Sequence, residues 1–255
     1  MSNFRVVIPA RMGSTRLPGK PLLPLAGKPM VQWTYERARR SGAGSVLVAT
    51  DDERIVAAVR DVGGEAALTA ATHASGTDRI AEIARRERWD DRDIVVNLQA
   101  DEPLMPPQLL DQVAQMFALH PGADITTLSV PLESVSALLD PHVVKVAAAA
   151  DQRALYFSRA PIPWSRDSAP AGLLSQRSCS GAHRHLGIYG YRVAALLRLA
   201  SLPPSPLEQL EKLEQLRALE HAMDIRVARA SVPPGPDVNT ADDLAVAAAL
   251  LHSGP

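Results

Sequence analysis

The chain has 255 residues, of which 46% are hydrophobic and 22% charged, so it can bury a sizeable core and is neither a disordered chain nor a coiled coil. Its 27 Lys and Arg residues balance 28 Asp and Glu residues, and a formal net charge of −1 excludes a broad basic surface for nucleic acid or anionic lipid. The single cysteine, Cys179, excludes an internal disulfide and favours a reducing compartment. The apolar runs are too short to span a bilayer, so we expect a soluble, cytoplasmic protein without a membrane partner.

Strand and helix patterns alternate through the first half of the chain. We expect strands at residues 4–9, 46–49, 94–98 and 124–130, and helices at residues 30–40, 51–62, 77–88 and 106–119. This alternation is typical of a mostly parallel sheet covered by helices on both faces, an α/β fold of the Rossmann-like kind. Ligands of such sheets bind outside the carboxyl ends of the strands, so we expect the chemistry in the loops that follow them.

The second half of the chain does not continue this alternation of strands and helices. Two short strand patterns at 143–149 and 153–157 are followed by a proline-rich stretch at 160–172, which indicates a hairpin and then an irregular arm or lid. We expect a further strand at 185–192, a helix at 207–220, a strand at 225–228 and a last helix that Thr240 and Asp243 cap. The fold is therefore expected to contain an inserted α+β hairpin subdomain.

The loop after the first predicted strand, residues 10–21, carries three cations and two glycines. Glycines let backbone N–H groups approach phosphate oxygens, and Arg11, Arg16 and Lys20 can neutralise charge that moves onto a leaving pyrophosphate. The loop is not a Walker P-loop, because five residues separate its two glycines and a proline follows its lysine. These residues fit a triphosphate, and the alternative is a basic surface loop.

Asp101 follows the predicted strand at 94–98 and would lie at the carboxyl end of that strand. Mg²⁺ prefers one or two carboxylates together with phosphate oxygens from a substrate, so an aspartate near a bound triphosphate meets its needs. The alternative is that Asp101 caps the helix that begins near Pro106.

Three further features each allow a functional and a structural interpretation. Ser75, in a Ser/Thr/Gly loop, could help to bind a base or could simply cap a helix. His183 and His185, with Cys179 upstream, lack the fourth ligand of an ordinary zinc site. Glu214 lies beside the apolar stripe of the helix predicted at 207–220. It could contact a substrate, or it could lie at the edge of the buried face with its carboxylate in solvent.

Together these motifs resemble the 3-deoxy-manno-octulosonate (Kdo) cytidylyltransferases, or CMP-Kdo synthetases, of Gram-negative bacteria, and the resemblance runs nearly end to end. The more specific motifs are Tyr-Phe-Ser-Arg, His-Leu-Gly-Ile-Tyr and Leu-Glu-Gln-Leu-Arg, in this order. The motifs that carry the resemblance are Ile8-Pro9-Ala10-Arg11, Ser14–Pro21, Ser75–Arg79, Asn97-Leu98-Gln99, Asp101-Glu102-Pro103, Val144-Lys145-Val146, Tyr156–Arg159, His185–Arg192 and Leu213–Arg217.

The resemblance implies a single nucleotidyltransferase domain over residues 1–255, with a sugar-binding and dimerisation insertion at 131–200. It implies that CMP is transferred from CTP to Kdo with release of pyrophosphate, that Mg²⁺ is the cofactor, that the protein is a homodimer and that the product serves lipopolysaccharide biosynthesis. No nucleic acid partner is expected.

The resemblance also assigns residues to roles. Arg11, Lys20 and Asp101 would be catalytic, and Asp101 and Asn239 would hold metal. The CTP-binding residues would be Ala10, Arg11, Ser14, Thr15, Arg16, Lys20, Ser75 and Gly76, and the sugar-binding residues would be Gln99, Arg159, His185, Tyr189, Glu214 and Gln215.

Two positions depart from the family pattern. Ala100 stands where the family usually has glycine, and Asn239 stands where it usually has an aspartate that ligates a second metal ion. The amide oxygen of Asn239 can still ligate, but one negative charge is missing, and Asp237 could compensate for it. The alternatives are therefore a CTP-binding homologue with impaired catalysis, and a cytidylyltransferase for a related sugar acid, an amino-Kdo or a sialic acid.

Overall fold

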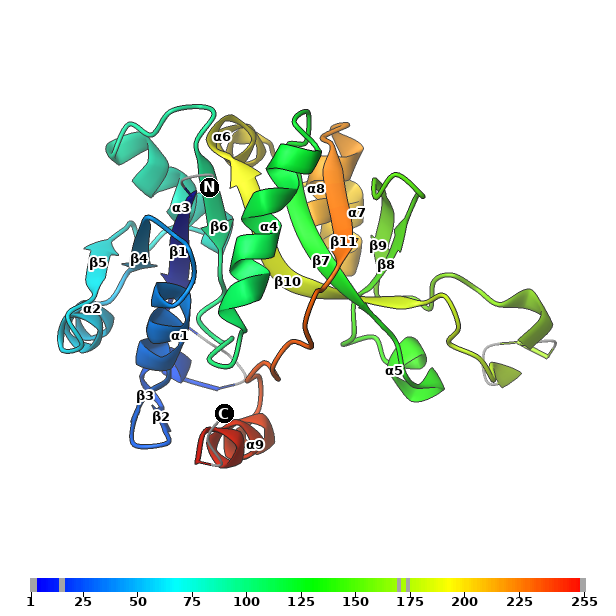
Figure 1. Ribbon diagram of the computed structural model, residues 1–255, viewed down its shortest axis with the longest axis horizontal. Coiled ribbons are helices and arrows are strands. Elements are labelled where there is room, and N and C mark those ends of the chain that lie inside the picture. Colours follow the sequence, from blue (N-terminus) through cyan, green and yellow to red (C-terminus); the bar gives the residue numbers. More distant parts are fainter. Residues whose placement is uncertain (1–3, 14–16, 169–170, 173–174, 253–255) are drawn as a thin grey trace. The chain divides into compact units, whose positions relative to one another are not determined.

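A computed structural model describes residues 4–13, 17–168, 171–172 and 175–252 (Figure 1). These residues form two compact units. The first unit comprises the described residues up to 115, those at 188–200 and those from 231 onward, and the second comprises 116–187 and 201–230. The insertion predicted at 131–200 overlaps the second unit but has different bounds.

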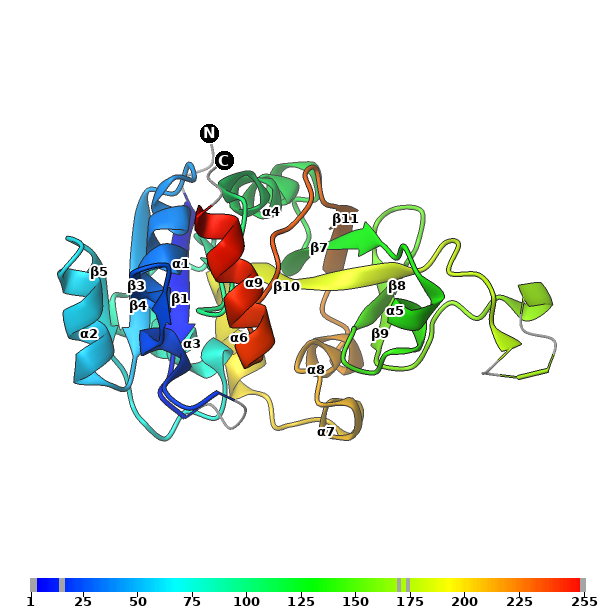
Figure 2. The same ribbon diagram turned by 90° about the horizontal axis from the view of Figure 1, so that it is seen from below.

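The first unit is built on parallel strands in the order β6-β1-β4-β5. The last residues of β10 pair antiparallel with β6, with Tyr189 opposite Asn97. Helices α1 and α2 cover one face of this sheet and α3 covers the other (Figures 1 and 2). The bounds are β1 Phe4–Ala10, α1 Met30–Arg39, β4 Ser45–Thr50, α2 Glu53–Arg60, β5 Glu65–Leu68, α3 Gly76–Arg86, β6 Ile94–Asn97 and β10 His183–Arg192.

The order of these strands places a reversal of winding beside β1. From β1 the chain passes through α1 to β4 and through α2 to β5, and it then returns through α3 to β6, on the other side of β1. A ligand site is expected where the winding direction reverses, outside the carboxyl ends of the strands. In this unit that point lies after Ala10 of β1 and Asn97 of β6, where the sequence predicted the chemistry.

Several shorter elements complete the first unit. The hairpin of β2 and β3 packs against α9, and buried Leu25, Met30, Val238 and Ala247 form a core cluster there. Thr240 and Asp243 cap α9 reciprocally, as predicted, with Asp243 N donating to Thr240 Oγ1 and Thr240 N to Asp243 Oδ2. The bounds are η1 Lys20–Leu22, β2 Pro24–Leu25, β3 Lys28–Pro29, α6 Val193–Ser201 and α9 Ala241–His252, while α4, Pro107–Leu119, begins in this unit.

The second unit contains strands in the order β11-β7-β10 and the predicted hairpin, β8 and β9. β7 and β11 are parallel, whereas β8 pairs antiparallel with β9 and with the first residues of β10. The hairpin prediction is confirmed. The bounds are β7 Ile125–Pro131, α5 Val135–Leu139, β8 Lys145–Ala148, β9 Ala154–Ser158, η2 Arg166–Ser168, α7 Pro206–Glu211, α8 Gln215–Glu220 and β11 Ile225–Arg229.

The prediction of one helix at 207–220 is wrong. Lys212 adopts a left-handed conformation with φ of 54°, which ends α7, and α8 begins only at Gln215. Glu214 therefore occupies the N-cap position of α8 rather than the face of a continuous helix. Leu213 and Leu216, on either side of Glu214, are both buried.

No helix in the described ranges has both the length and the apolarity that a membrane span requires.

Candidate functional site

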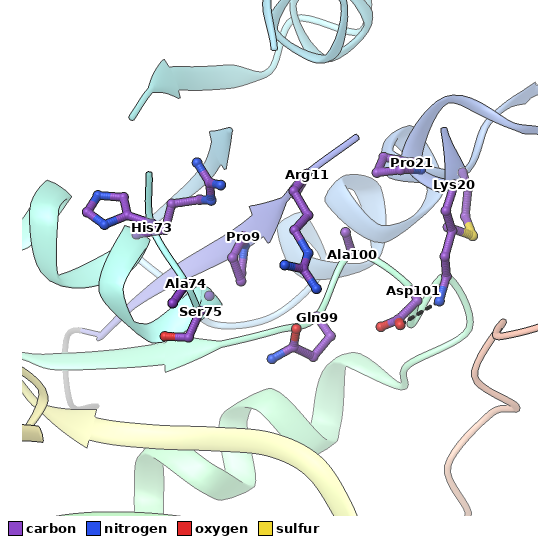
Figure 3. Close-up of a pocket in the computed structure, with 14 residues that line it drawn as sticks. Pro9, Arg11, Lys20, Pro21, His73, Ala74, Ser75, Gln99, Ala100 and Asp101 are labelled. Carbon is purple, nitrogen blue, oxygen red and sulfur yellow. Dashed lines mark hydrogen bonds and ion pairs between the residues drawn. The ribbon is translucent and has the colours of Figure 1, made fainter. Parts of the chain in front are cut away.

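A pocket of about 270 Å³ lies at the carboxyl ends of β1 and β6, in the first unit (Figure 3). The glycine-bearing loop, the loop before α3 and the segment after β6 all contribute to its wall. Its lining residues are Pro9, Ala10, Arg11, Lys20, Pro21, Met30, His73, Ala74, Ser75, Gly76, Arg79, Gln99, Ala100 and Asp101.

Lys20 is held at the wall of this pocket by two oxygen atoms. Gly19, with φ of 69°, turns the chain into η1, and the Lys20 side chain is only 10% exposed. Its Nζ donates to Asp101 Oδ2 at 2.6 Å, the dashed contact in Figure 3, and to Asn239 Oδ1 at 3.3 Å. The structure therefore brings together Lys20, Asp101 and Asn239, three residues that the family resemblance assigns to the phosphates and the metal.

The segment that carries Asn239 is fixed against Asp101. The backbone N–H of Val238 donates to the carbonyl oxygen of Asp101 at 2.9 Å. The Asn239 backbone N–H donates to Asp243 Oδ2 at 2.9 Å, and its side-chain Nδ2 donates to Asp237 Oδ2. Because Nδ2 is directed at Asp237, the amide oxygen is the atom that faces Lys20.

Ser75 and Gly76 begin α3 beside the pocket. Ser75 Oγ accepts from Asp78 N at 3.1 Å and Asp78 Oδ2 accepts from Ser75 N at 3.1 Å, so the helix-cap interpretation of Ser75 is confirmed. The residue also lines the pocket. A Cβ at Gly76 would come within 2.9 Å of Pro9 Cγ, so a residue without a side chain is needed there.

The other predicted nucleotide contacts are placed in part. Ala10 is buried at the end of β1, while Arg11 is exposed and its guanidinium extends into the pocket, as does the side chain of Gln99 (Figure 3). Ser14, Thr15 and Arg16 lie outside the described residues. Ala100 is buried, and its carbonyl oxygen accepts from Thr34 Oγ1 at 3.0 Å.

The predicted sugar-binding residues belong to both units. Gln99 and Tyr189 are in the first unit, whereas Arg159, His185, Glu214 and Gln215 are in the second. The ring of Tyr189 lies against that of Tyr191, tilted by 32° at a centroid distance of 5.9 Å, and Glu214 Oε1 lies 3.6 Å from Nη2 of Arg217.

His185 is buried and electrically neutral. Its Nε2 lies 2.9 Å from Thr127 Oγ1, and its ring meets Phe157 edge-on at a centroid distance of 5.0 Å. Burial, with a smaller contribution from Arg184, lowers the pKa of His185 to about 3. The imidazole can therefore offer a neutral hydrogen bond to a ligand but not a positive charge. Among the described residues, no group of three or more His, Cys, Asp or Glu side chains is arranged to hold a metal ion.

Arg159 is surrounded by backbone carbonyl groups and by Glu211. Its Nε donates to the carbonyl oxygen of Glu211 at 2.7 Å, and its Nη1 donates to that of Pro141 at 2.8 Å. Glu211 was not identified from the sequence, since it lies outside the motifs that carry the resemblance. In the sequence, the one feature that connects Glu211 with the predicted site is its position three residues before Glu214.

Comparison with known proteins gives matches over almost the whole chain. The family described as "Cytidylyltransferase" matches residues 5–225. A 3-deoxy-manno-octulosonate cytidylyltransferase of Halorhodospira halophila is 52% identical and covers 98% of this chain and 97% of that protein. The one from Thioalkalivibrio sulfidiphilus is 50% identical and covers 98% and 100%.

A solved structure has the same fold over the full length. It is described as CMP:2-keto-3-deoxy-manno-octonic acid synthetase complexed with CTP, and it matches with a TM-score of 0.88 and 40% identity, covering 100% of both chains. These matches confirm the predicted α/β nucleotidyltransferase fold.

Proposed function

Since the chain belongs to the family of 3-deoxy-manno-octulosonate cytidylyltransferases, we propose that it transfers CMP from CTP to Kdo and releases pyrophosphate. The observation that carries this proposal is the grouping of Lys20, Asp101 and Asn239 at the carboxyl ends of β1 and β6. A cation, a carboxylate and an amide oxygen in one place suit the charge changes of phosphoryl transfer.

In the proposed reaction a hydroxyl oxygen of Kdo forms a bond to the α-phosphorus of CTP. The bond from the α-phosphorus to the bridging oxygen breaks, pyrophosphate leaves with that electron pair, and the hydroxyl proton passes to solvent. Arg11 and Lys20 stabilise the negative charge that grows on the leaving group, and Ser75 and Gly76 lie where the cytosine would bind. We assign no residue as a dedicated general base.

We propose Mg²⁺ as the cofactor, because the oxygen atoms at this site fit a hard cation. Asp101 supplies a carboxylate and Asn239 an amide oxygen, and both atoms lie within hydrogen-bond reach of the same Lys20 ammonium group. Mg²⁺ usually takes only one or two protein ligands and completes its coordination with water and substrate phosphates. When bound, the ion would neutralise phosphate charge and polarise the α-phosphorus.

The proposed function is tested by incubating the protein with CTP, Kdo and Mg²⁺ and measuring pyrophosphate. We expect release that depends on all three. Absence of release, in conditions where an established CMP-Kdo synthetase works, would contradict the proposal. Release with an amino-Kdo or a sialic acid at a higher kcat/KM than with Kdo would assign the activity to a related sugar acid.

Asn239→Asp tests whether Asn239 is a metal ligand. The new carboxylate would lie beside Asp237 and Asp101, so we expect Mn²⁺, used as a probe of the Mg²⁺ site, to bind about tenfold more tightly in the presence of CTP, equivalent to roughly 1.4 kcal/mol. Titration followed by electron paramagnetic resonance measures this. Unchanged affinity would remove Asn239 from the metal site, and an already high rate that the substitution leaves unchanged would exclude impaired catalysis.

Arg159→Ala tests the proposed contact with the sugar acid. Arginine binds carboxylates by charge-assisted hydrogen bonds, so we expect the KM for Kdo to rise about 30-fold or more, with the KM for CTP within about twofold. Steady-state kinetics with each substrate varied in turn measures both. Equal effects on the two substrates would contradict a role at the sugar.

We further propose that the protein acts in the cytoplasm as a homodimer and that its product activates Kdo for lipopolysaccharide biosynthesis. The family resemblance motivates the homodimer, and in the second unit Leu155, Trp164 and Leu210 are 53%, 41% and 79% exposed, so their apolar side chains are accessible to a second copy of the chain. Sedimentation velocity tests the homodimer.

A further inference from the structure

In the second unit, the position of Arg159 is set by contacts on both its backbone and its side chain. Its backbone N–H donates to Glu211 Oε2 at 2.6 Å, and its backbone carbonyl accepts from Lys145 Nζ at 2.6 Å. Two guanidinium nitrogens, Nε and Nη1, donate to backbone carbonyl oxygens, as described above. Within the described part of the chain Nη2 makes no hydrogen bond, so that end of the guanidinium is available to a ligand.

Glu211 is the residue on which most of these contacts converge. Besides the Arg159 backbone, its carboxylate accepts from Ser158 Oγ at 2.9 and 3.1 Å and from Tyr156 OH at 3.2 Å. Its own carbonyl oxygen accepts from Arg159 Nε. One residue at the end of α7 therefore binds three of the four residues of the Tyr-Phe-Ser-Arg motif.

Lys145 holds the same segment from the other direction. It is fully buried, and its Nζ donates to the carbonyl oxygens of Asp140, Val143 and Arg159 at 2.8, 2.6 and 2.6 Å. These three acceptors use all three N–H groups of the ammonium group. Lys145 is therefore committed to the backbone, which leaves Arg159 as the cation of this cluster that can meet a substrate.

We propose that Glu211 is a positioning residue for the sugar acid, which fixes Arg159 so that its Nη2 end receives the substrate carboxylate. A guanidinium that is already held in place loses less conformational entropy when it binds an anion than a mobile side chain would. If the carboxylate of Glu211 faced the guanidinium of Arg159, it would compete with the substrate carboxylate for that positive charge. The side-chain oxygens of Glu211 instead bind the backbone N–H and the two hydroxyls, and only its carbonyl contacts Nε.

This inference rests on the proposed function, because it takes Arg159 as the group that binds the Kdo carboxylate. In this proposal Arg159 touches the sugar acid, and Glu211 sets the geometry of Arg159. Loss of Glu211 should therefore weaken the binding of the sugar acid but not that of CTP, and it should do so only when Arg159 is present.

The test is Glu211→Gln, measured by steady-state kinetics with Kdo and CTP varied in turn. We expect the KM for Kdo to rise about tenfold and the KM for CTP to stay within about twofold, since a neutral amide forms weaker hydrogen bonds than a carboxylate. Asp151→Asn is the matched control. This carboxylate accepts from the Arg153 backbone N–H at 3.1 Å and from Arg226 Nη1 at 3.1 Å, at the turn of the same hairpin, without contacting Arg159. The KM values of the Asp151→Asn variant for Kdo and for CTP should equal those of the wild-type protein.

A double-mutant cycle with Arg159→Ala separates positioning from stability. If Glu211 acts through Arg159, Glu211→Gln should change the KM for Kdo by less than about twofold in the Arg159→Ala background. A tenfold effect in that background, or no effect in the wild-type background, would overturn the inference while leaving the proposed function intact. A wild-type protein that releases no pyrophosphate with Kdo would instead defeat the proposed function. Thermal melting of every variant shows which of them are folded.

Discussion

Replacing Asp101 with Asn is expected to lower kcat about a thousandfold, the largest single effect that we predict for a conservative substitution in this chain. The substitution keeps the shape of the side chain and removes the carboxylate that would hold the metal ion. Its amide oxygen can still accept from Lys20, which is nearly buried, so the fold should survive. Pyrophosphate release at saturating CTP, Kdo and Mg²⁺ measures the loss.

Asp93→Asn is the matched control for this experiment. Asp93 precedes β6, whereas Asp101 follows it, and its Oδ2 lies 2.7 Å from Arg5 Nη1 with 31% of the side chain exposed, against 2.6 Å and 33% for the ion pair of Asp101. We expect Asp93→Asn to retain the wild-type kcat. Retention of kcat by Asp101→Asn as well would show that Asp101 is only a structural partner of Lys20.

Lys20→Met is expected to lower kcat/KM for CTP by about 10²- to 10³-fold. The ammonium group is a buried cation in the pocket wall, and its loss would remove charge stabilisation from the leaving pyrophosphate. Asp101 is one-third exposed, so water can solvate its carboxylate when Lys20 is absent, and the protein should fold. Steady-state kinetics and calorimetric titration with CTP separate the effect on the transition state from the effect on binding.

Lys28→Met is the matched control, because Lys28 is a cation in a comparable environment away from the pocket. Lys28 Nζ lies 2.5 Å from Glu36 Oε1 and 3.8 Å from the centroid of the Trp33 ring. Its removal should lower stability without changing kcat/KM. If Lys20→Met behaved in the same way, Lys20 would have no part in the reaction.

Hydrophobic periodicity was sufficient to predict most of the first unit. The buried apolar runs of β1, β4 and β6 and the amphipathic patterns of α1, α2 and α3 are local signals, and their alternation implies a parallel sheet. The break between α7 and α8 has no such signal, because the left-handed residue is Lys212 rather than the glycine that usually marks a helix end. The short strands β2, β3 and β5 were missed because two to four residues carry too little pattern.

The candidate site was predicted from motifs rather than from geometry. Strand order explains why Lys20 and Asp101 meet, but the contact between Lys20 and Asn239 joins residues 219 positions apart, and only the family resemblance placed them together. Glu211 was missed for a related reason. Its proposed role rests on hydrogen bonds from Ser158 of β9 and from Arg159, which follows it, more than 50 positions earlier in the chain, and the sequence carries no mark of those bonds.

The ion pair between Lys20 and Asp101 would link the binding of the nucleotide to that of the metal ion if Asp101 holds Mg²⁺ as we propose. A divalent cation that approaches Asp101 in the free protein would meet an ammonium group already bound to the same carboxylate, which would lower the affinity for the cation there. The triphosphate of CTP would offer Lys20 an alternative anionic partner and so free the carboxylate as the nucleotide arrives. By thermodynamic reciprocity, the metal ion would then raise the affinity for CTP by the same factor as CTP raises the affinity for the metal ion. One lysine would thereby give the two ligands positive cooperativity.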